Sequence, residues 1–404
     1  MANVLIIGGG FAGVWAAAGA VRTYREAGLS GSPLRVTLVA PGDDMVIRPR
    51  LYEPDPQRMR VPLDRVLGPI GVRRVAATVT GIAVESRTVV AVGRDGSQIA
   101  LGYDRLVLAA GSRVVRPTID GAEHLFDVDT MPAAAALHAH VVRLPAAPYE
   151  PGRFSAVVVG AGFTGLEVAT ELVDRLRAVA NGRPVRVVLV ERAGVVGPEL
   201  GEGPRPQILE ALAETGVEVR LGVQVDALDA GGASLSDGTV IPAHTVVWTA
   251  GMRASSLTEH VPGERDAIGR LRVDEFLEVV GVPGVYAAGD TAAAVAEPGH
   301  VVMQSCQHAV PQGKFVGVNV ASDLLGRPRV PFAPDPYVTC LDLGSYGAVL
   351  TAGWDRAVQQ SRHAAKDLKR SINAEWSYPP VDDADTIVLH ADHRTTWPTA
   401  ALAQ

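Results

Sequence analysis

Glycines at the spacing G-x-G-x-x-G occur twice, and this spacing can present backbone N–H groups to a phosphate. The first set comprises Gly8, Gly10 and Gly13, with Phe11 and Ala12 between the last two. The second set comprises Gly160, Gly162 and Gly165, with Phe163 and Thr164 between the last two. In such a turn the first glycine permits a sharp bend, the second lets a diphosphate approach the backbone, and the third lets a helix pack closely. That helix offers free N–H groups and the positive end of its dipole to the phosphates.

The elements expected around each glycine turn are those that the motif requires. One G-x-G-x-x-G is a weak signal in a chain with 43 glycines, so its context decides. Both turns follow a short apolar run, typical of a buried strand, and precede an apolar helical stretch and a second apolar strand, at 35–39 and at 185–190. The chain therefore contains two βαβ units of similar length. Two dinucleotides in one chain suggest electron transfer between them, and glycine turns that bind no nucleotide are the alternative.

Further strands end at turns made of small residues. The third strand of each unit ends at Ala109, Ala110 and Gly111 or at Thr249, Ala250 and Gly251. Another apolar run, 285–288, leads into Gly289 and Asp290. The Asp290 carboxylate can accept a hydrogen bond from a ligand hydroxyl group at this strand end, or it can cap the following helix.

Glu191 ends the second strand of the second unit, where a carboxylate can accept hydrogen bonds from both hydroxyls of a ribose. The same carboxylate would repel a 2′-phosphate, so the second unit is expected to prefer NADH to NADPH. Arg192 follows directly and weakens that preference, because a guanidinium can bind a phosphate. A strand-end glutamate without a ligand is the alternative.

Composition excludes several classes of protein. The chain has 404 residues and a net charge of -7, so we expect two to three domains and no binding of nucleic acid. Two cysteines, Cys306 and Cys340, can form neither a disulfide framework nor a four-cysteine zinc site, and the histidines show no metal-ligand spacing. The uncharged run 4–21 contains five glycines and follows no positively charged segment, which favours strand, turn and helix over a membrane span.

Over residues 3–325 the sequence resembles the flavoproteins with two dinucleotide-binding domains, and among them the type II NADH dehydrogenases and their soluble relatives. The resemblance rests on the two glycine turns, the two small-residue turns and the run 285–290. It implies that the first unit binds FAD, that the second binds NAD(P)H, and that Asp290 accepts a hydrogen bond from the ribityl chain of FAD.

We therefore expect an α/β fold of two Rossmann-like domains, in which an NAD(P)H domain is inserted into an FAD domain, followed by a small C-terminal α+β region. The expected segments are 1–145 for the first part of the FAD domain, 146–262 for the NAD(P)H domain, 263–330 for the second part of the FAD domain, and 331–404 for the C-terminal region. Helices are predicted near 311–325 and 354–373.

Three side chains resemble residues that act beside the flavin in this family. Glu167 follows the second glycine turn, and its position in the family points toward the nicotinamide and the flavin. Gln307 and Gln312 resemble the helix on the quinone side, although Pro311 stands where the family usually has another glutamine. The alternatives are a glutamate that stabilises a helix N-terminus and glutamines that contact no ligand.

Two departures from the family affect the expected FAD site. Ala40 and then Pro41 stand where an acidic residue usually meets the FAD ribose, so Asp43, Asp44 or the backbone would have to substitute. Arg48 and Arg50 resemble the family's loop after the second strand, where either could contact an FAD phosphate, with a solvated basic turn as the alternative. No cysteine pair follows the first glycine turn, which excludes the chemistry of disulfide reductases.

These features predict an FAD-dependent NAD(P)H dehydrogenase that passes hydride from NADH to FAD and then electrons to a quinone or another small acceptor. The alternatives are a soluble flavoprotein that acts on a specialised metabolite or a redox protein, and a nucleotide-responsive sensor with little turnover. The segment 355–376 has mostly alanine at its apolar positions, so any contact with a membrane should be weak and peripheral. We expect a cytoplasmic location, at most peripheral to the inner face of the membrane, and a homodimer is compatible with these features.

Overall fold

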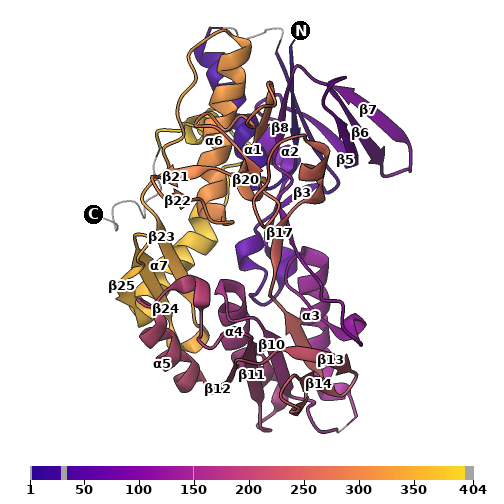
Figure 1. Cartoon of the computed structure of the whole chain (residues 1–404), viewed down its shortest axis with the longest axis vertical. Helices are drawn as coiled ribbons and strands as arrows, with labels where there is room; N and C mark the ends of the chain where they lie inside the picture. The colour runs from indigo at the N-terminus through magenta and orange to yellow at the C-terminus, as the bar shows by residue number, and fades with distance from the viewer. Residues whose placement is uncertain (1, 29–33, 149, 396–404) are drawn as a thin grey trace.

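The computed structural model describes residues 2–28, 34–148 and 150–395 (Figure 1). Its first unit is built on a seven-stranded sheet in the order β19-β8-β1-β2-β5-β6-β7. Strands β1 (Asn3–Ile7), β2 (Arg35–Ala40), β5 (Arg73–Ala83), β8 (Arg105–Leu108) and β19 (Val285–Ala287) form its parallel part, and β6 (Thr88–Gly93) and β7 (Gln98–Gly102) extend it as antiparallel strands. The strand β19 comes from far along the chain, so the first unit is completed only after the second has been made.

Helices α1 (Phe11–Glu26) and α6 (Cys306–Leu324) pack side by side against the first sheet (Figure 1). Small residues bring their backbones together, because a Cβ atom at Gly313 would lie 2.5 Å from the carbonyl oxygen of Ala12. A Cβ at Gly317 would likewise lie 2.5 Å from the oxygen of Ala16. Only glycine allows this separation. Two helices from opposite parts of the sequence thus form one closely packed pair.

The second unit repeats the arrangement on a smaller scale in the lower part of Figure 1. Its four parallel strands, in the order β12-β11-β10-β16, are β10 (Ser155–Val159), β11 (Arg186–Glu191), β12 (Val217–Leu221) and β16 (Thr245–Trp248). Helices α3 (Met131–Arg143), α4 (Phe163–Ala180) and α5 (Arg205–Thr215) accompany it, with a small antiparallel sheet of β13 (Val225–Asp229), β14 (Gly232–Leu235) and β15 (Val240–Pro242). The chain crosses between the units through β9 (Ser112–Val114) and β17 (Met252–Ala254), which pair with each other.

The C-terminal region is a three-stranded antiparallel sheet with a helix. It contains β23 (Val338–Asp342), β24 (Ala348–Ala352), β25 (Ala357–Ser361) and α7 (Arg362–Ser371), followed by a π-helical turn over Ile372–Trp376 and by α8 (Ala384–His390). The helix predicted at 354–373 is therefore wrong at its start, because 357–361 pair with β24 as a strand. The helix predicted at 311–325 begins earlier, at Cys306, because Ser305 caps it by accepting a hydrogen bond from the N–H of His308.

The remaining elements are short. They are β3 (Asp44–Val46), β4 (Arg60–Pro62), α2 (Leu63–Leu67), β18 (Leu271–Arg272), β20 (Ala292–Ala293), β21 (Val295–Glu297) and β22 (His300–Val301). The run 4–21 forms β1, the glycine turn and most of α1. Among the described residues, none of the helices combines the length and the apolar character needed to cross a bilayer.

Candidate functional site

A cavity of about 660 Å³ opens between the two units and the C-terminal region. It is lined by residues of the first glycine turn, the ends of β8 and β19, the start of α4, the start of α6, and the strand β23. Elements from all three parts of the molecule meet here, as expected where the carboxyl ends of parallel strands leave a crevice. Its size and mixed lining are typical of a cofactor site.

The first glycine turn has the geometry of a phosphate cradle. Gly8 has a φ of +120°, and a Cβ there would lie 2.1 Å from the carbonyl oxygen of Ala109. A Cβ at Gly13 would lie 1.9 Å from the oxygen of Gly8, whereas Gly10, which lines the cavity, faces open space. No side chain caps α1, so its first N–H groups remain available to an anion. The residues present here fit the diphosphate of a dinucleotide.

The second glycine turn repeats this geometry. Gly160 has a φ of +103°, a Cβ at Gly165 would lie 1.8 Å from the oxygen of Gly160, and Gly162 faces open space. Helix α4 begins at Phe163 without a side-chain cap. Phe163 and Thr164 line the cavity, so the second turn also meets it.

The second strand ends differently in the two units. At the end of β11 the Glu191 carboxylate accepts hydrogen bonds of 2.8 Å from the N–H groups of Ala161 and Ala193. At the end of β2, Ala40 is buried and lines the cavity without offering any polar side-chain atom. Asp44 lines the cavity nearby, whereas Asp43 forms ion pairs of 2.8 Å with Arg74 and Arg94.

A polar cluster lies beside the ends of β8 and β19. Ser112 donates a 2.6 Å hydrogen bond to Oδ2 of Asp290, and Arg48 donates to Ser112 at 2.9 Å. Arg48 also pairs with Asp129 and contacts the sulfur of Met252. All five residues line the cavity. Ser112, Asp129 and Met252 were not predicted, although Ser112 directly follows the small-residue turn at 109–111.

Glu167 lines the cavity and pairs with Lys369, which was not predicted as a site residue. Nζ of Lys369 lies 2.9 Å from Oε1 of Glu167, which also accepts the N–H of Asp342 at 3.2 Å. Burial raises the pKa of Glu167, and Lys369 opposes this shift. Burial acts to lower the pKa of Lys369, but Glu167 raises it beyond its ordinary value. A positively charged group is therefore held at the cavity wall by α7.

A second carboxyl group, that of half-buried Glu171, lies on the same helix. Burial, together with the negative charge of Asp342, raises the pKa of Glu171 to about 7. Asp342 accepts hydrogen bonds from Tyr52 at 3.0 Å and from Lys366 at 2.5 Å. The face of α4 that meets the C-terminal region thus carries one carboxyl group, that of Glu171, that can exchange protons near neutral pH.

The two predicted glutamines lie in different surroundings. Gln307 lines the cavity, and its amide, oriented to satisfy both groups, pairs with the backbone N–H and carbonyl of Val338. Gln312 does not line it, being fully buried, with its oxygen accepting the N–H of Gly289 at 3.0 Å. Burial raises the pKa of the Cys306 and Cys340 thiols, which both line the cavity, to about 11.

The remaining predicted cofactor residues lie around the same cavity. Its wall includes Phe11, Ala12, Ala110, Gly111 and Gly289. Gly251 follows β16, and its carbonyl accepts the N–H of Val115 at 2.7 Å. Among the residues that the structure describes, no group of three or more His, Cys, Asp or Glu side chains could hold a metal ion.

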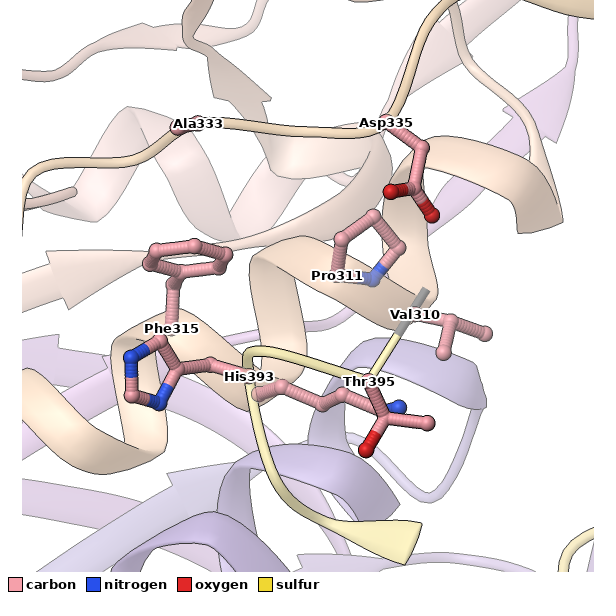
Figure 2. A pocket seen from close by; sticks show the side chains of 8 residues that line it. Val310, Pro311, Phe315, Ala333, Asp335, His393 and Thr395 are labelled. Carbon is pink, nitrogen blue, oxygen red and sulfur yellow. The ribbon is translucent and has the colours of Figure 1, made fainter. Parts of the chain in front are cut away.

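Pro311 faces away from this cavity. It lines a separate hollow of about 10 Å³ between α6 and the C-terminal segment, where the His393 ring packs edge-on against Phe315 (Figure 2). A volume of this size holds at most one water molecule. Pro311 therefore contributes to packing of the C-terminal segment rather than to the wall of the large cavity.

Comparison with known proteins supports one family. The model of the family "Pyridine nucleotide-disulphide oxidoreductase" matches residues 2–313. An NADH dehydrogenase-like protein of Mycobacterium tuberculosis is 45% identical over 395 residues, covering 97% of this chain and 98% of the relative. A demethylphylloquinone reductase of Synechocystis is 29% identical, and the alignment covers 86% of each chain.

A solved structure shares the fold at low sequence identity. The NDH2 of Plasmodium falciparum in complex with NADH superposes with a TM-score of 0.77 at 13% identity, over 96% of each chain. Two Rossmann-like units and the C-terminal region are thus arranged as in a known oxidoreductase. The chain belongs to the pyridine nucleotide-disulphide oxidoreductase family, and it is an NAD(P)H-dependent flavoprotein oxidoreductase.

Proposed function

We propose that this protein transfers a hydride from NADH to FAD and then passes the electrons to a quinone or a quinone-like small molecule. This proposal rests on one observation: the same cavity is lined by residues at the start of both α1 and α4, the helices that follow the two glycine turns. FAD, when bound, supplies the redox chemistry, since it can accept a hydride and give up its electrons to a second substrate. The protein's own residues bind, orient and shield the reactants.

In this proposal the first glycine turn holds FAD, and Arg48 and Asp290 lie beside it in the cavity. The second turn holds NADH, whose ribose hydroxyls would bind Glu191 in place of, or together with, its backbone donors. The Glu191 carboxylate would repel the 2′-phosphate of NADPH, which favours NADH, and the adjacent Arg192 weakens this preference. We also propose the segments 1–145, 146–262, 263–330 and 331–404 as the domain boundaries.

The acceptor would approach the wall formed by Gln307, Val338 and Lys369. Reduction of a quinone consumes protons, and the buried pair of Glu167 and Lys369 stands at this wall. Both members of this pair are titratable groups within reach of a substrate at the wall, which is the arrangement that general acid–base chemistry requires. The Synechocystis relative, named for its action on a quinone, supports this class of acceptor. Gln312 would support the wall from behind through its hydrogen bond to Gly289.

The test separates the two half-reactions. The purified holoprotein, with its flavin absorbance recorded, is mixed anaerobically with NADH and then with a soluble menaquinone or ubiquinone analogue. We expect NADH to bleach the flavin band and the quinone to restore it within the turnover time. A bleached band that quinones leave unchanged would exclude a quinone acceptor, and a band that neither NADH nor NADPH bleaches would exclude the whole proposal. Stable bleaching without turnover would instead indicate the sensor.

A further inference from the structure

A buried arginine of the C-terminal region lacks the partner that its charge requires. Arg356 lies in the turn between β24 and β25 and is 6% exposed. Its Nη1 atom is buried without a hydrogen-bond partner. Among the described residues no carboxylate pairs with it, whereas buried Arg22 contacts both Glu26 and Asp392. A guanidinium taken out of water without an anion is strongly destabilising.

The local structure holds Arg356 in place despite this penalty. Its φ of +54° lies in the left-handed region, which is unfavourable for a residue with a side chain. Its N–H donates to the oxygen of Gly353 at 3.2 Å, and its own oxygen lies so close to Gly203 that a Cβ there would approach to 2.5 Å. The second unit and the C-terminal region therefore fix this turn together.

The guanidinium contacts two aromatic rings of the cavity wall. Its central carbon is 5.2 Å from the ring centre of Phe163 and 5.5 Å from that of Tyr337. Both rings line the cavity. Cation–π contacts offset part of the loss of hydration, but they satisfy none of the five N–H donors of the guanidinium.

Phe163 is also the first residue of α4, so the arginine lies beside the start of that helix. The helix dipole makes this position unfavourable for a cation and favourable for an anion. An anion bound between the arginine and the helix N-terminus would pair with the buried guanidinium. It would also interact favourably with the positive end of the helix dipole. The second glycine turn, at this same place, has the geometry of a diphosphate cradle.

We infer that Arg356 binds the diphosphate of the nicotinamide dinucleotide, so that the C-terminal region completes the NADH site. This inference rests on the proposed assignment of NADH to the second unit. NADH and NADPH share the diphosphate, so Arg356 contributes affinity to both, while Glu191 discriminates between them. The C-terminal region then has a role in nucleotide binding that its sequence did not indicate.

The test measures binding to the oxidised holoprotein rather than turnover. Two probes are titrated by calorimetry: ADP-ribose, which has the diphosphate but no nicotinamide, and the tetrahydro analogue of NADH, which cannot donate a hydride. For Arg356→Gln we expect the affinity for both probes to fall by about tenfold to a hundredfold, as for a lost charge-assisted hydrogen bond. Arg356→Lys should recover part of the loss, and the flavin content should stay unchanged. The matched control is Arg370→Gln on α7, an exposed arginine that pairs with Asp367, and it should bind both probes as the wild type does.

Thermal unfolding separates a binding role from a structural one. We expect Arg356→Met to unfold at the same temperature as the wild type or higher without a nucleotide, because an unpaired buried charge has been removed. At the same concentration of ADP-ribose, the unfolding temperature of Arg356→Met should rise less than that of the wild type. If the Arg356 variants bound ADP-ribose as tightly as the wild type, the inference would be overturned, whether or not their affinity for the NADH analogue fell. A lower unfolding temperature with unchanged affinity would show that Arg356 is structural, and would overturn it too. If the wild type binds neither probe and NADH leaves its flavin oxidised, the proposed function itself fails.

Discussion

Helices α1 and α4 follow equivalent glycine turns, yet α1 packs against small apolar residues and α4 packs against charged residues. Helix α1 contacts α6 through glycine and alanine, and its face toward that helix brings backbone against backbone. Helix α4 instead presents Glu167 and Glu171 to charged residues of the C-terminal region. One supersecondary unit thus supports a closely packed apolar contact in the first copy and a buried ionic contact in the second.

The difference matches the tasks proposed for the two units. A cofactor that stays bound needs a rigid cradle, and the glycine contacts between α1 and α6 leave little freedom to move. A nucleotide that enters and leaves, and a reaction that takes up protons, need charged and titratable groups near the site. We therefore expect changes in the first unit to affect FAD retention and changes in the second to affect NADH binding.

The largest effect is expected from the third glycine of each turn. In Gly13→Ala the new Cβ would lie 1.9 Å from the oxygen of Gly8, so the turn must distort and FAD should be lost. In Gly165→Ala the equivalent distance is 1.8 Å, but the protein should keep its flavin and lose reduction by NADH. Each substitution should destabilise the fold by about 3 kcal/mol. Flavin content after gel filtration and anaerobic bleaching by NADH measure the two outcomes.

Gly81→Ala in β5 is the matched control, because a Cβ there meets nothing within 4 Å. It should retain FAD and react with NADH normally. If Gly13→Ala kept its flavin while Gly165→Ala lost it, the assignment of the two cradles would be reversed.

A smaller effect is expected from the end of β11. Glu191→Ala removes the proposed ribose acceptor and leaves the N–H of Ala161 without its partner. We expect the affinity for the tetrahydro analogue of NADH to fall by about tenfold or more, with unchanged flavin content. Glu199→Ala, an exposed glutamate nearby, should bind this analogue like the wild type. An unchanged affinity in Glu191→Ala would show that the strand end does not select the nucleotide.

A third prediction concerns the pH dependence of stability. The folded-state pKa of Glu171 is about 7, above its ordinary value of 4.5, so the folded protein favours the protonated carboxyl group. The corresponding stability is complete below pH 4.5 and is lost as the pH rises through 7. Relative to the wild type, Glu171→Gln should therefore gain about 3 kcal/mol between pH 4.5 and pH 8. Urea unfolding at both pH values measures this gain.

Glu199→Gln serves as the control, since Glu199 is an exposed glutamate. Its stability relative to the wild type should stay nearly constant over the same pH range. A Glu171→Gln profile parallel to that of the wild type would contradict the raised pKa of Glu171.

The sequence predicted the repeated part of the molecule because its signals are local. A glycine spacing, an apolar strand before it and a helix after it lie within one short segment, and the structure has both units. The pairing of Glu167 with Lys369 was not predictable in this way, since the two residues are far apart in sequence and Lys369 resembles any surface lysine of a helix. The same holds for Arg356, whose missing partner is visible only once its burial is known.

The segment 354–373 shows a different limit. Its charged residues resemble an amphipathic helix, yet 357–361 become the edge strand β25 because they pair with β24. Such pairing depends on a partner strand, and tertiary context overrides local preference. At Ala40 the sequence was informative in another way: it indicated a missing acidic side chain, and the structure has Asp44 on the cavity wall close by.

The paired crossings β9 and β17 determine how the two units can move. The chain enters and leaves the second unit through segments that are hydrogen-bonded to each other, from Ser112 with Ala254 to Val114 with Met252. They therefore behave as one ribbon rather than as two independent tethers. Any rotation that opens the site for nucleotide exchange must bend this ribbon next to Arg48, which contacts Ser112 and Met252. Because Ser112 and Met252 also line the cavity proposed for FAD, such a motion would alter the surroundings of the cofactor.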